Sequence, residues 1–347
     1  MTTSFYALKI LRTTLIAGVL AIAGTAWAES PELKPDHPKS YTVTEGDTLW
    51  GIAEKFLKEP WRWPEIWQRN QNIKNPHLIY PGDVLVLTTV EGEPKVKALQ
   101  QRKLTKLSPN VRAMPREEPI PTIPPSAIQA FIDKPLIINV GDLDRSGYVA
   151  TGLEGKLNLG KFSVFYGRNM EESESKLYHI LRPGRKYVDK ATNEFLGMYV
   201  EDVGTARLLA AGETAKLEVL ASNLEVSPGD RLIPASKDLG FPYFEPRAPG
   251  KEVRGTILDF PKGVNEGGPF SIAVISLGER DDLAPGHVLR ILRKERPQID
   301  PVTKQKFEPP LEPSGLVMLF RTFEKVSFGL ITNANLAVRV GDVVETP

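Results

Sequence analysis

Cysteine is absent from the 347 residues of this chain. Thiolate catalysis and disulfide bridges are therefore excluded, and the fold must rest on packed cores, which a chain of this length can build. An excess of charge is also lacking, because 44 Lys and Arg accompany 43 Asp and Glu and the formal net charge is +1. Without a basic excess or a dense Lys/Arg run, the sequence does not indicate a nucleic-acid partner.

Histidine is scarce, and its four residues are far apart in the sequence: His37, His77, His179 and His287. A zinc site needs several such side chains to converge, and no H-E-x-x-H motif occurs. The G-x-S-x-G elbow of serine hydrolases is missing as well. We expect neither a metal ion nor a cofactor.

The most pronounced hydrophobic run, residues 15–24, is too short for a bilayer, which requires about 20 residues. It follows Lys9 and Arg12 and precedes Ala26-Trp27-Ala28. This order of basic, apolar and small residues is typical of a secretory signal peptide. We expect cleavage of residues 1–28 and an exported chain without a transmembrane anchor. An uncleaved membrane anchor is the alternative.

Aromatic residues make up only 8% of the chain, yet the tryptophans outside the signal segment lie close together: Trp50, Trp61, Trp63 and Trp67. Tryptophan buries a large surface, so it can complete the thin core of a small module. Stacking on a sugar ring is the other interpretation. The sequence favours the core for Trp50, Trp63 and Trp67, which lie in and around expected helices, and exposure for Trp61.

Residues 41–88 have the pattern of one small β-α-α-β module. A strand is predicted at residues 41–43, and Asp47 is the expected N-cap of a helix with apolar residues at helical spacing, namely Leu49, Ile52, Ala53 and Phe56. Pro64 suits the first turn of a second helix, in which Ile66, Trp67, Asn70 and Ile73 continue the spacing. The turn "YPGD" and the apolar strand "VLVLT" then complete the module.

This module resembles a LysM domain through "YTVTEGDTLWGIAEKF" and "NQNIKNPHLIYPGDVLVL". The resemblance implies recognition of glycans that contain N-acetylglucosamine, with peptidoglycan as the partner. It also implies one shallow groove between the loop after strand 1 and the loop before strand 2, with these glycan-binding residues: Gly46, Asp47, Thr48, Leu49, Asn75, Pro76 and Ile79. Backbone groups of residues 46–48 would bind an acetamido group, and Leu49, Pro76 and Ile79 would offer apolar surface. For Leu49 and Ile79, core packing alone is the alternative.

The composition divides the remaining chain at about residues 90 and 120. Residues 90–119 are polar, mixed in charge and punctuated by proline, which indicates a semi-extended linker. Residues 120–347 open with a short helix expected at 126–132 and continue with short apolar runs separated by Gly and Pro. This pattern predicts small barrels or sandwich-like units. The fold class is therefore α+β: a LysM domain at 40–89 and a β-rich region at 120–347.

An internal repeat is present in the β-rich region. Asp189 and Thr192 recur at equal spacing as Asp300 and Thr303, and "LEVSPGDRL" recurs as "LAVRVGDVV". "DDLAPGHVL" is a weaker third copy of that closing turn. The D-x-x-T segments are expected to be hairpin tips at which the Asp side chain caps the backbone.

The whole chain resembles the type IV pilus secretin-associated proteins of the TsaP type, whose C-terminal part is related to that of the flagellar assembly protein FlgT. The segments "RWPEIW", "NPHLIYPGD", "IPTIP" and "SPGDRLIPA" carry the resemblance. It implies a periplasmic, non-enzymatic adaptor that binds peptidoglycan and associates with the secretin oligomer of the outer membrane. Strand addition at open sheet edges is one mode of binding such a partner.

Two other functions stay open at this point. A peptidoglycan hydrolase could use a lone glutamate, and "EESESKLY" at residues 171–178 contains several. That stretch is polar, whereas a catalytic Glu usually needs apolar burial to raise its pKa. A flagellar assembly factor of the same adaptor type is the second alternative.

Overall fold

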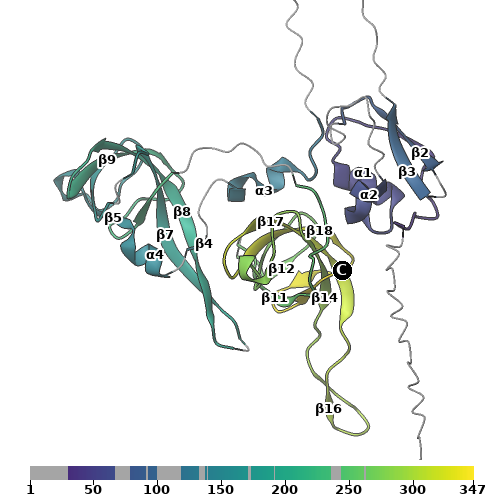
Figure 1. The fold of residues 1–347 in the computed structure, drawn as a ribbon. Helices are drawn as coiled ribbons and strands as arrows, with labels where there is room; N and C mark the ends of the chain where they lie inside the picture. The colour runs from purple at the N-terminus through teal and green to yellow at the C-terminus, as the bar shows by residue number, and fades with distance from the viewer. Residues whose placement is uncertain are drawn as a thin grey trace, which may run out of the picture. The chain divides into compact units, whose positions relative to one another are not determined.

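The computed structural model describes residues 30–66, 79–90, 93–99, 119–132, 137–138, 140–170, 173–190, 192–235, 244–261 and 263–347. The first module contains β1 (Ser40–Thr42), α1 (Leu49–Phe56), the 3-10 turn η1 (Pro60–Arg62), α2 (Trp63–Ile66), β2 (Val84–Val90) and β3 (Glu93–Leu99) (Figure 1). β2 is the central strand of an antiparallel sheet in the order β1-β2-β3. The expected order of strand, two helices and strand is found, and a third strand is added. The continuation of the second helix beyond Ile66 was expected in residues outside the described part.

The helix α1 buries its apolar stripe against α2 and the sheet. Leu49, Ile52 and Phe56 share one core cluster with Trp63 and Leu85. Helical spacing places the three α1 side chains on one face, and burial of that face stabilises a helix of only eight residues.

The start of α1 differs from the prediction. Thr48, not Asp47, is the N-cap residue, and its hydroxyl oxygen accepts the N–H of Gly51 at 3.1 Å. The carboxylate of Asp47 closes the preceding turn, because it accepts the N–H of Thr44 at 2.8 Å and the hydroxyl of Tyr41 at 3.0 Å. Asp47 lies one residue too early to cap the helix.

The tryptophans mostly have structural roles. Trp63 is 2% exposed in the core of the first module. Trp50 is equally buried but packs in a different cluster, with Ile123 and Phe244, so its expected place in the module core is wrong. Trp61, expected to be exposed, is partly buried against that second cluster. Trp67 lies outside the described residues.

The predicted linker contains a strand at its beginning. β3 pairs with β2 over its full length, from Val84 opposite Leu99 to Val90 opposite Glu93. Alternation of Val96 and Ala98 with Lys95 and Lys97 is a strand pattern, but the lysines give the segment the composition of a linker. Val96 is buried in the core of the module, so this sheet face is apolar while the lysine face is not.

The first barrel follows α3 (Pro125–Ile132), β4 (Ile137–Ile138) and α4 (Val140–Arg145). Its strands are β5 (Gly147–Gly152), β6 (Val164–Arg168), β7 (Leu177–Val188), β8 (Phe195–Ala210), β9 (Thr214–Ser222) and β10 (Arg231–Pro234), with the turn η2 (Leu153–Gly155) after β5. The order is β8-β7-β10-β5-β6-β9, pairing of β8 with β9 closes the sheet, and β4 pairs with β8. The helix predicted at residues 126–132 is α3.

The second barrel is closed in the order β11-β13-β18-β17-β14-β20. Its strands are β11 (Arg254–Asp259), β13 (Ile272–Ile275), β14 (Val288–Arg293), β17 (Glu312–Thr322), β18 (Ser327–Ala334) and β20 (Val343–Glu345). The remaining elements are two short ribbons and a turn: β12 (Glu266–Gly267) with β19 (Val338–Arg339), β15 (Gln298–Ile299) with β16 (Lys306–Phe307), and η3 (Glu279–Asp281).

Both barrels have the same cyclic strand order, with β11 in the place of β5, β14 in that of β7 and β20 in that of β10. This order agrees with the repeat in the sequence. Closure pairs the barrel strands with one another, but residues 182–188 of β7 pair only with β8, and β4 also pairs only with β8. Strand addition, considered above for partner binding, is therefore limited in the described part of the first barrel to such extensions.

Five turns in the described part of the chain share one geometry. In each a glycine has a φ of +90° to +96°, a region that favours glycine: Gly46, Gly82, Gly229, Gly286 and Gly341. The next side chain accepts the backbone N–H three residues before it: Asp47, Asp83, Asp230, His287 and Asp342. The weak third copy in the sequence, "DDLAPGHVL", therefore forms the same turn with His in place of Asp.

The two D-x-x-T segments form the tips of hairpins. Asp189 accepts the N–H of Thr192 and Asp300 accepts the N–H of Thr303, each at 3.0 Å. The predicted capping of the backbone by aspartate is found at both tips. No helix in the described part of the chain is both long enough and apolar enough to cross a bilayer.

Candidate functional site

The described residues that the sequence predicts for the glycan groove lie in the turn before α1 and directly before β2. Gly46 is exposed, and no atom lies within 4 Å of the position that a Cβ would take there. The side chains of Asp47 and Thr48 are both engaged in local bonds, the first in the turn and the second in the helix cap. The groups that this wall offers to a ligand are therefore mainly those of the backbone.

The side chains of Leu49 and Ile79 do not face the groove. They are 3% and 1% exposed and belong to the module core, which is the alternative that the sequence left open for them. The Leu49 N–H and the Ile79 carbonyl are hydrogen-bonded to one other segment of the chain. Asn75 and Pro76, the other predicted site residues, lie outside the described part.

That other segment is residues 119–123, which the sequence places at the start of the β-rich region. Ile120 donates its N–H to the carbonyl of Ile79 at 2.8 Å, and the Pro121 carbonyl accepts the N–H of Leu49 at 2.9 Å. The carbonyl of Thr122 accepts the N–H of Trp50 at 3.1 Å. The first N–H groups of a helix have no partner within it, and here the carbonyls of residues 121 and 122 serve two of them.

Burial holds this segment in place on both sides. Ile120 is 6% exposed and packs in the module core, while Ile123, 1% exposed, packs with Trp50. Thr122 donates its hydroxyl to the carbonyl of Phe244 at 2.9 Å. The apolar pattern "IPTIP" marked this segment in the sequence, but only as part of a family resemblance and not as part of the site.

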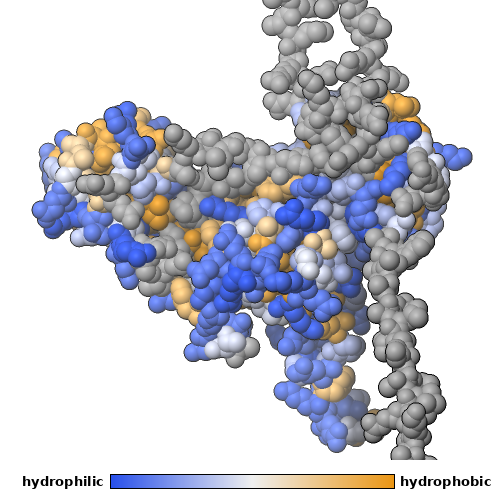
Figure 2. All heavy atoms as spheres, viewed as in Figure 1, coloured by the Kyte–Doolittle hydropathy of each residue, from blue (hydrophilic) through white to orange (hydrophobic). Residues whose placement is uncertain are grey.

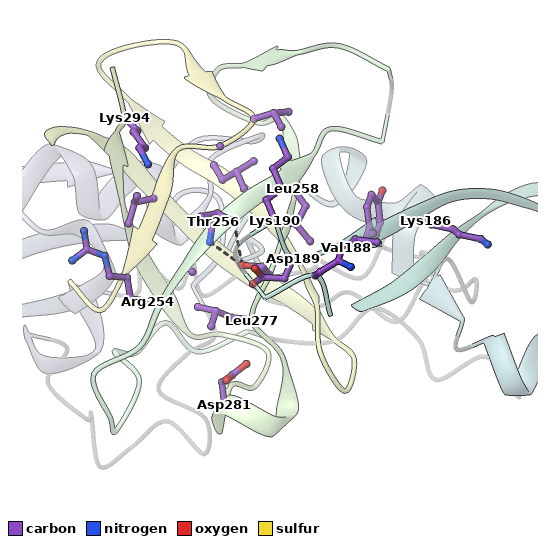
Figure 3. A pocket seen from close by; sticks show the side chains of 18 of the residues that line it. Lys186, Val188, Asp189, Lys190, Arg254, Thr256, Leu258, Leu277, Asp281 and Lys294 are labelled. Carbon is purple, nitrogen blue, oxygen red and sulfur yellow. Dashed lines mark hydrogen bonds between the residues drawn. The ribbon is translucent and has the colours of Figure 1, made fainter. Parts of the chain in front are cut away.

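A second site is the cleft of about 1110 Å³ where the β7–β8 hairpin meets the second barrel (Figure 3). Its charged lining has both signs, with Lys186, Asp189 and Lys190 from the hairpin and Arg254 and Lys294 from the barrel. Figure 3 shows Lys186 directed away from the other labelled side chains, so the charged groups are not directed at one point. The cleft therefore offers a mixed ionic surface and no convergent set of reacting groups.

Ion pairs hold the hairpin against the second barrel beside this cleft. Asp259 accepts a hydrogen bond from Arg185 and another from the hydroxyl of Tyr187, each at 2.7 Å. Burial, followed by the bond to Asp259, raises the pKa of Tyr187, so the phenol remains protonated. Glu194, at the start of the second strand of the hairpin, accepts hydrogen bonds from Lys325 and Arg280, each at 2.7 Å. These bonds lower the pKa of Glu194.

The described residues show no arrangement typical of a metal centre or of a catalytic glutamate. Among the residues that the structure describes, no three His, Asp or Glu side chains converge in a way that could hold a metal ion. Glu174, in the glutamate-rich stretch that the hydrolase hypothesis depends on, is exposed. Glu171 and Glu172 lie outside the described part.

The comparisons with known proteins agree on the first module. The LysM domain model matches residues 41–88. The uncharacterized protein YqbP of Bacillus subtilis (strain 168) is 43% identical over an alignment of 58 residues, and the match covers 14% of this chain and 26% of YqbP. The chain thus spans about a quarter of the length of this curated relative. Residues 41–88 are a LysM domain, a module that binds cell-wall glycan.

Proposed function

We propose that this protein is a periplasmic, non-enzymatic adaptor that binds peptidoglycan through its LysM domain. The observation that carries the proposal is the LysM match over residues 41–88, where a backbone N–H at the start of α1 and a backbone carbonyl before β2 bond to the same segment of the chain. The acetamido group of N-acetylglucosamine has one N–H and one carbonyl. A groove that offers backbone N–H and C=O groups side by side is complementary to it.

The proposed glycan-binding residues keep their places but change their roles. Gly46, which is exposed, and the half-buried Asp47 and Thr48 are proposed for one wall. Leu49 and Ile79 are proposed to contribute the N–H and the carbonyl of their backbones, which bond to Pro121 and Ile120 in this structure. Asn75 and Pro76 are proposed for the opposite wall on the basis of the sequence alone. One such site binds weakly, so firm retention on the wall requires several copies held together.

Sedimentation with purified sacculi tests this proposal in the full chain. We expect the double substitution Thr48→Ala and Pro76→Ala to reduce the sedimented fraction. Thr89→Ala with Pro94→Ala is the matched control, because Thr89 and Pro94 face each other at the β2–β3 end of the same module. Thr48→Ala also removes a helix cap worth about 1 kcal/mol, so urea denaturation must first show a folded LysM domain in each variant whose sedimentation is compared. Unchanged sedimentation of a folded double variant would contradict the proposed groove.

The proposed partner of the β-rich region is the secretin oligomer of the type IV pilus. The support is the family resemblance, together with a difference between the two hairpins. The first hairpin is bound to the second barrel through Asp259 and Glu194. The second exposes Ile299, Val302 and Phe307 by 68%, 86% and 49%. Figure 2 shows a hydrophobic patch on this hairpin, low in the view, amid hydrophilic surface.

Copurification from envelopes tests the partner. We expect Ile299→Asp with Val302→Asp to separate the full chain from secretin complexes, because a carboxylate would face an apolar contact. Leu157→Asp with Leu209→Asp is the matched control, since these side chains are 66% and 47% exposed on the first barrel. Copurification with flagellar basal bodies instead of secretin would favour the flagellar alternative. Release of soluble fragments from sacculi by the purified chain would favour the hydrolase alternative.

A further inference from the structure

The peptide segment of residues 119–124 has the properties of a ligand bound in the LysM groove. Its N–H at Ile120 and its carbonyls at Pro121 and Thr122 bond to groups on both walls. These are secondary amide groups, the same chemical class as the acetamido group of the sugar. A glycan chain that used the Leu49 N–H or the Ile79 carbonyl would meet donors and acceptors that are already occupied.

The composition of the segment suits this role. Proline stands at positions 119, 121 and 124, and proline restricts the chain to extended conformations, which lowers the entropy lost on binding. Proline also has no N–H, so the segment presents few donors other than the Ile120 N–H that bonds to Ile79. Between the prolines, Ile120 packs in the LysM core and Ile123 packs against Trp50.

We propose that residues 119–124 are an intramolecular peptide ligand of the LysM groove, and that a peptidoglycan glycan binds by displacing them. This inference rests on the proposed function for the identity of the displacing ligand. The groove is then a surface that accepts extended, proline-containing peptide as well as glycan. Its apparent affinity for glycan is reduced by the fraction of molecules in which the segment is released.

Displacement also connects the groove to the second barrel. Thr122 bonds to the carbonyl of Phe244, and Ile123 lies in a cluster that includes Met318 and Phe328 of the barrel strands. Glycan that removes residues 120–122 from the groove must disturb these contacts or strain the chain between them. Occupancy of the groove by glycan and packing of the segment are therefore coupled.

Amide hydrogen exchange of the unmodified full chain tests the displacement without any substitution. The probe is an N-acetylglucosamine tetramer. Because the Ile120 N–H bonds to the groove, we expect its protection to fall when the tetramer saturates the protein. The Val288 N–H, which bonds to Arg247 at 2.9 Å in the second barrel, is the internal control and keeps its protection. Saturation by the tetramer with unchanged protection at Ile120 would overturn the proposal.

A variant gives the second measurement. Ile120→Ser with Ile123→Ser weakens the segment, and we expect the folded variant to bind the tetramer about tenfold more tightly or better. Ile180→Ser with Ile331→Ser is the matched control, because both side chains are fully buried in clusters that share no residue with the segment or the groove, and its affinity stays unchanged. A synthetic peptide of residues 117–125, added in excess, should reverse the gain. Equal affinity in variant and wild type would overturn the proposal.

Failure of the proposed function gives a different result. In that case neither the wild type nor the Ile120→Ser/Ile123→Ser variant binds the tetramer or sacculi, which overturns displacement by glycan. The added peptide then tests whether the groove binds the peptide of residues 117–125, which is the other half of the proposal. Shifts of the Leu49 and Trp50 amide signals on its addition to the variant would support the peptide-binding groove, and their absence would overturn it.

Discussion

Trp63→Ala should remove most of the stability of the LysM domain. Trp63 is 2% exposed within a core cluster of one small module, and it lines a cavity of about 20 Å³ that already exists there. Truncation of a buried Trp to Ala costs about 3–5 kcal/mol, because the lost transfer free energy is joined by the cost of the enlarged cavity. A module of this size has about 3–5 kcal/mol in total from a single core. We therefore expect an unfolded LysM domain beside folded barrels.

Tryptophan fluorescence is the assay, because in a chain that begins at residue 29 every tryptophan lies between residues 50 and 67. The signal thus reports the LysM domain together with the cluster that Trp50 and Trp61 share with the second barrel, whereas far-ultraviolet circular dichroism reports mainly the barrels. Trp61→Ala is the control, since Trp61 is only partly buried, and we expect a cost of about 1 kcal/mol. Equal urea midpoints for Trp63→Ala and the wild type would refute this account of the core.

Three further predictions concern the barrels. Asp230→Ala should cost about 2 kcal/mol of unfolding free energy, measured by denaturation, because the Asp230 carboxylate accepts two bonds from Arg182 and one from the Ser227 N–H. The side chain of Arg182 is 34% exposed, so hydration of the freed guanidinium limits the cost. An unfolding free energy equal to that of the wild type would contradict the role of this turn. The pKa of Glu194 is lowered by Lys325 and Arg280, so its contribution is present above the unfolded pKa and lost as pH falls through the folded pKa. We expect amide exchange in the β7–β8 hairpin to accelerate below about pH 4, and Glu194→Gln to remove that dependence. Gly204→Ala should destabilise the first barrel by at least about 1–3 kcal/mol, since a Cβ would lie 2.2 Å from the Ala221 carbonyl oxygen. Gly160→Ala, with no atom within 4 Å, is its control, and equal stability of the two variants would contradict this packing.

Local patterns made the LysM domain predictable. The apolar spacing of Leu49, Ile52 and Phe56 requires a helix, and the glycine turns at Gly46 and Gly82 set the ends of β1 and β2. β3 escaped prediction because its lysines gave it the composition of a linker. Asp47 was expected to cap α1 because aspartate is a common cap, but its carboxylate accepts the N–H of Thr44 in the preceding turn.

The barrels were predictable as a class and less so as a list of strands. β8 is the longest strand, but Gly197, Gly204 and the pair Glu201-Asp202 interrupt its alternation, so its pattern does not predict one continuous strand. Bulges accompany these interruptions, as the shifts in pairing with β7 show. Closure of the sheets depends on pairings between distant strands, which no local pattern records.

The candidate site was predictable only on the walls that the LysM motifs form. Residues 120–122 are bound to the LysM domain through backbone hydrogen bonds. Every residue has a backbone carbonyl and almost every residue has an N–H, so the residue types do not reveal which of them form such bonds. The burial of Leu49 and Ile79 likewise depends on the packing of the whole module. Local spacing allowed both packing and sugar contact for these two residues.

The most direct test of the central claim is sedimentation of the full chain with sacculi before and after chemical removal of the N-acetyl groups from the glycan. The account assigns recognition to backbone groups at Leu49 and Ile79 that bond to an amide. It predicts sedimentation with intact sacculi and its loss after de-N-acetylation, with recovery when the glycan is acetylated again. Equal sedimentation with both preparations would contradict it.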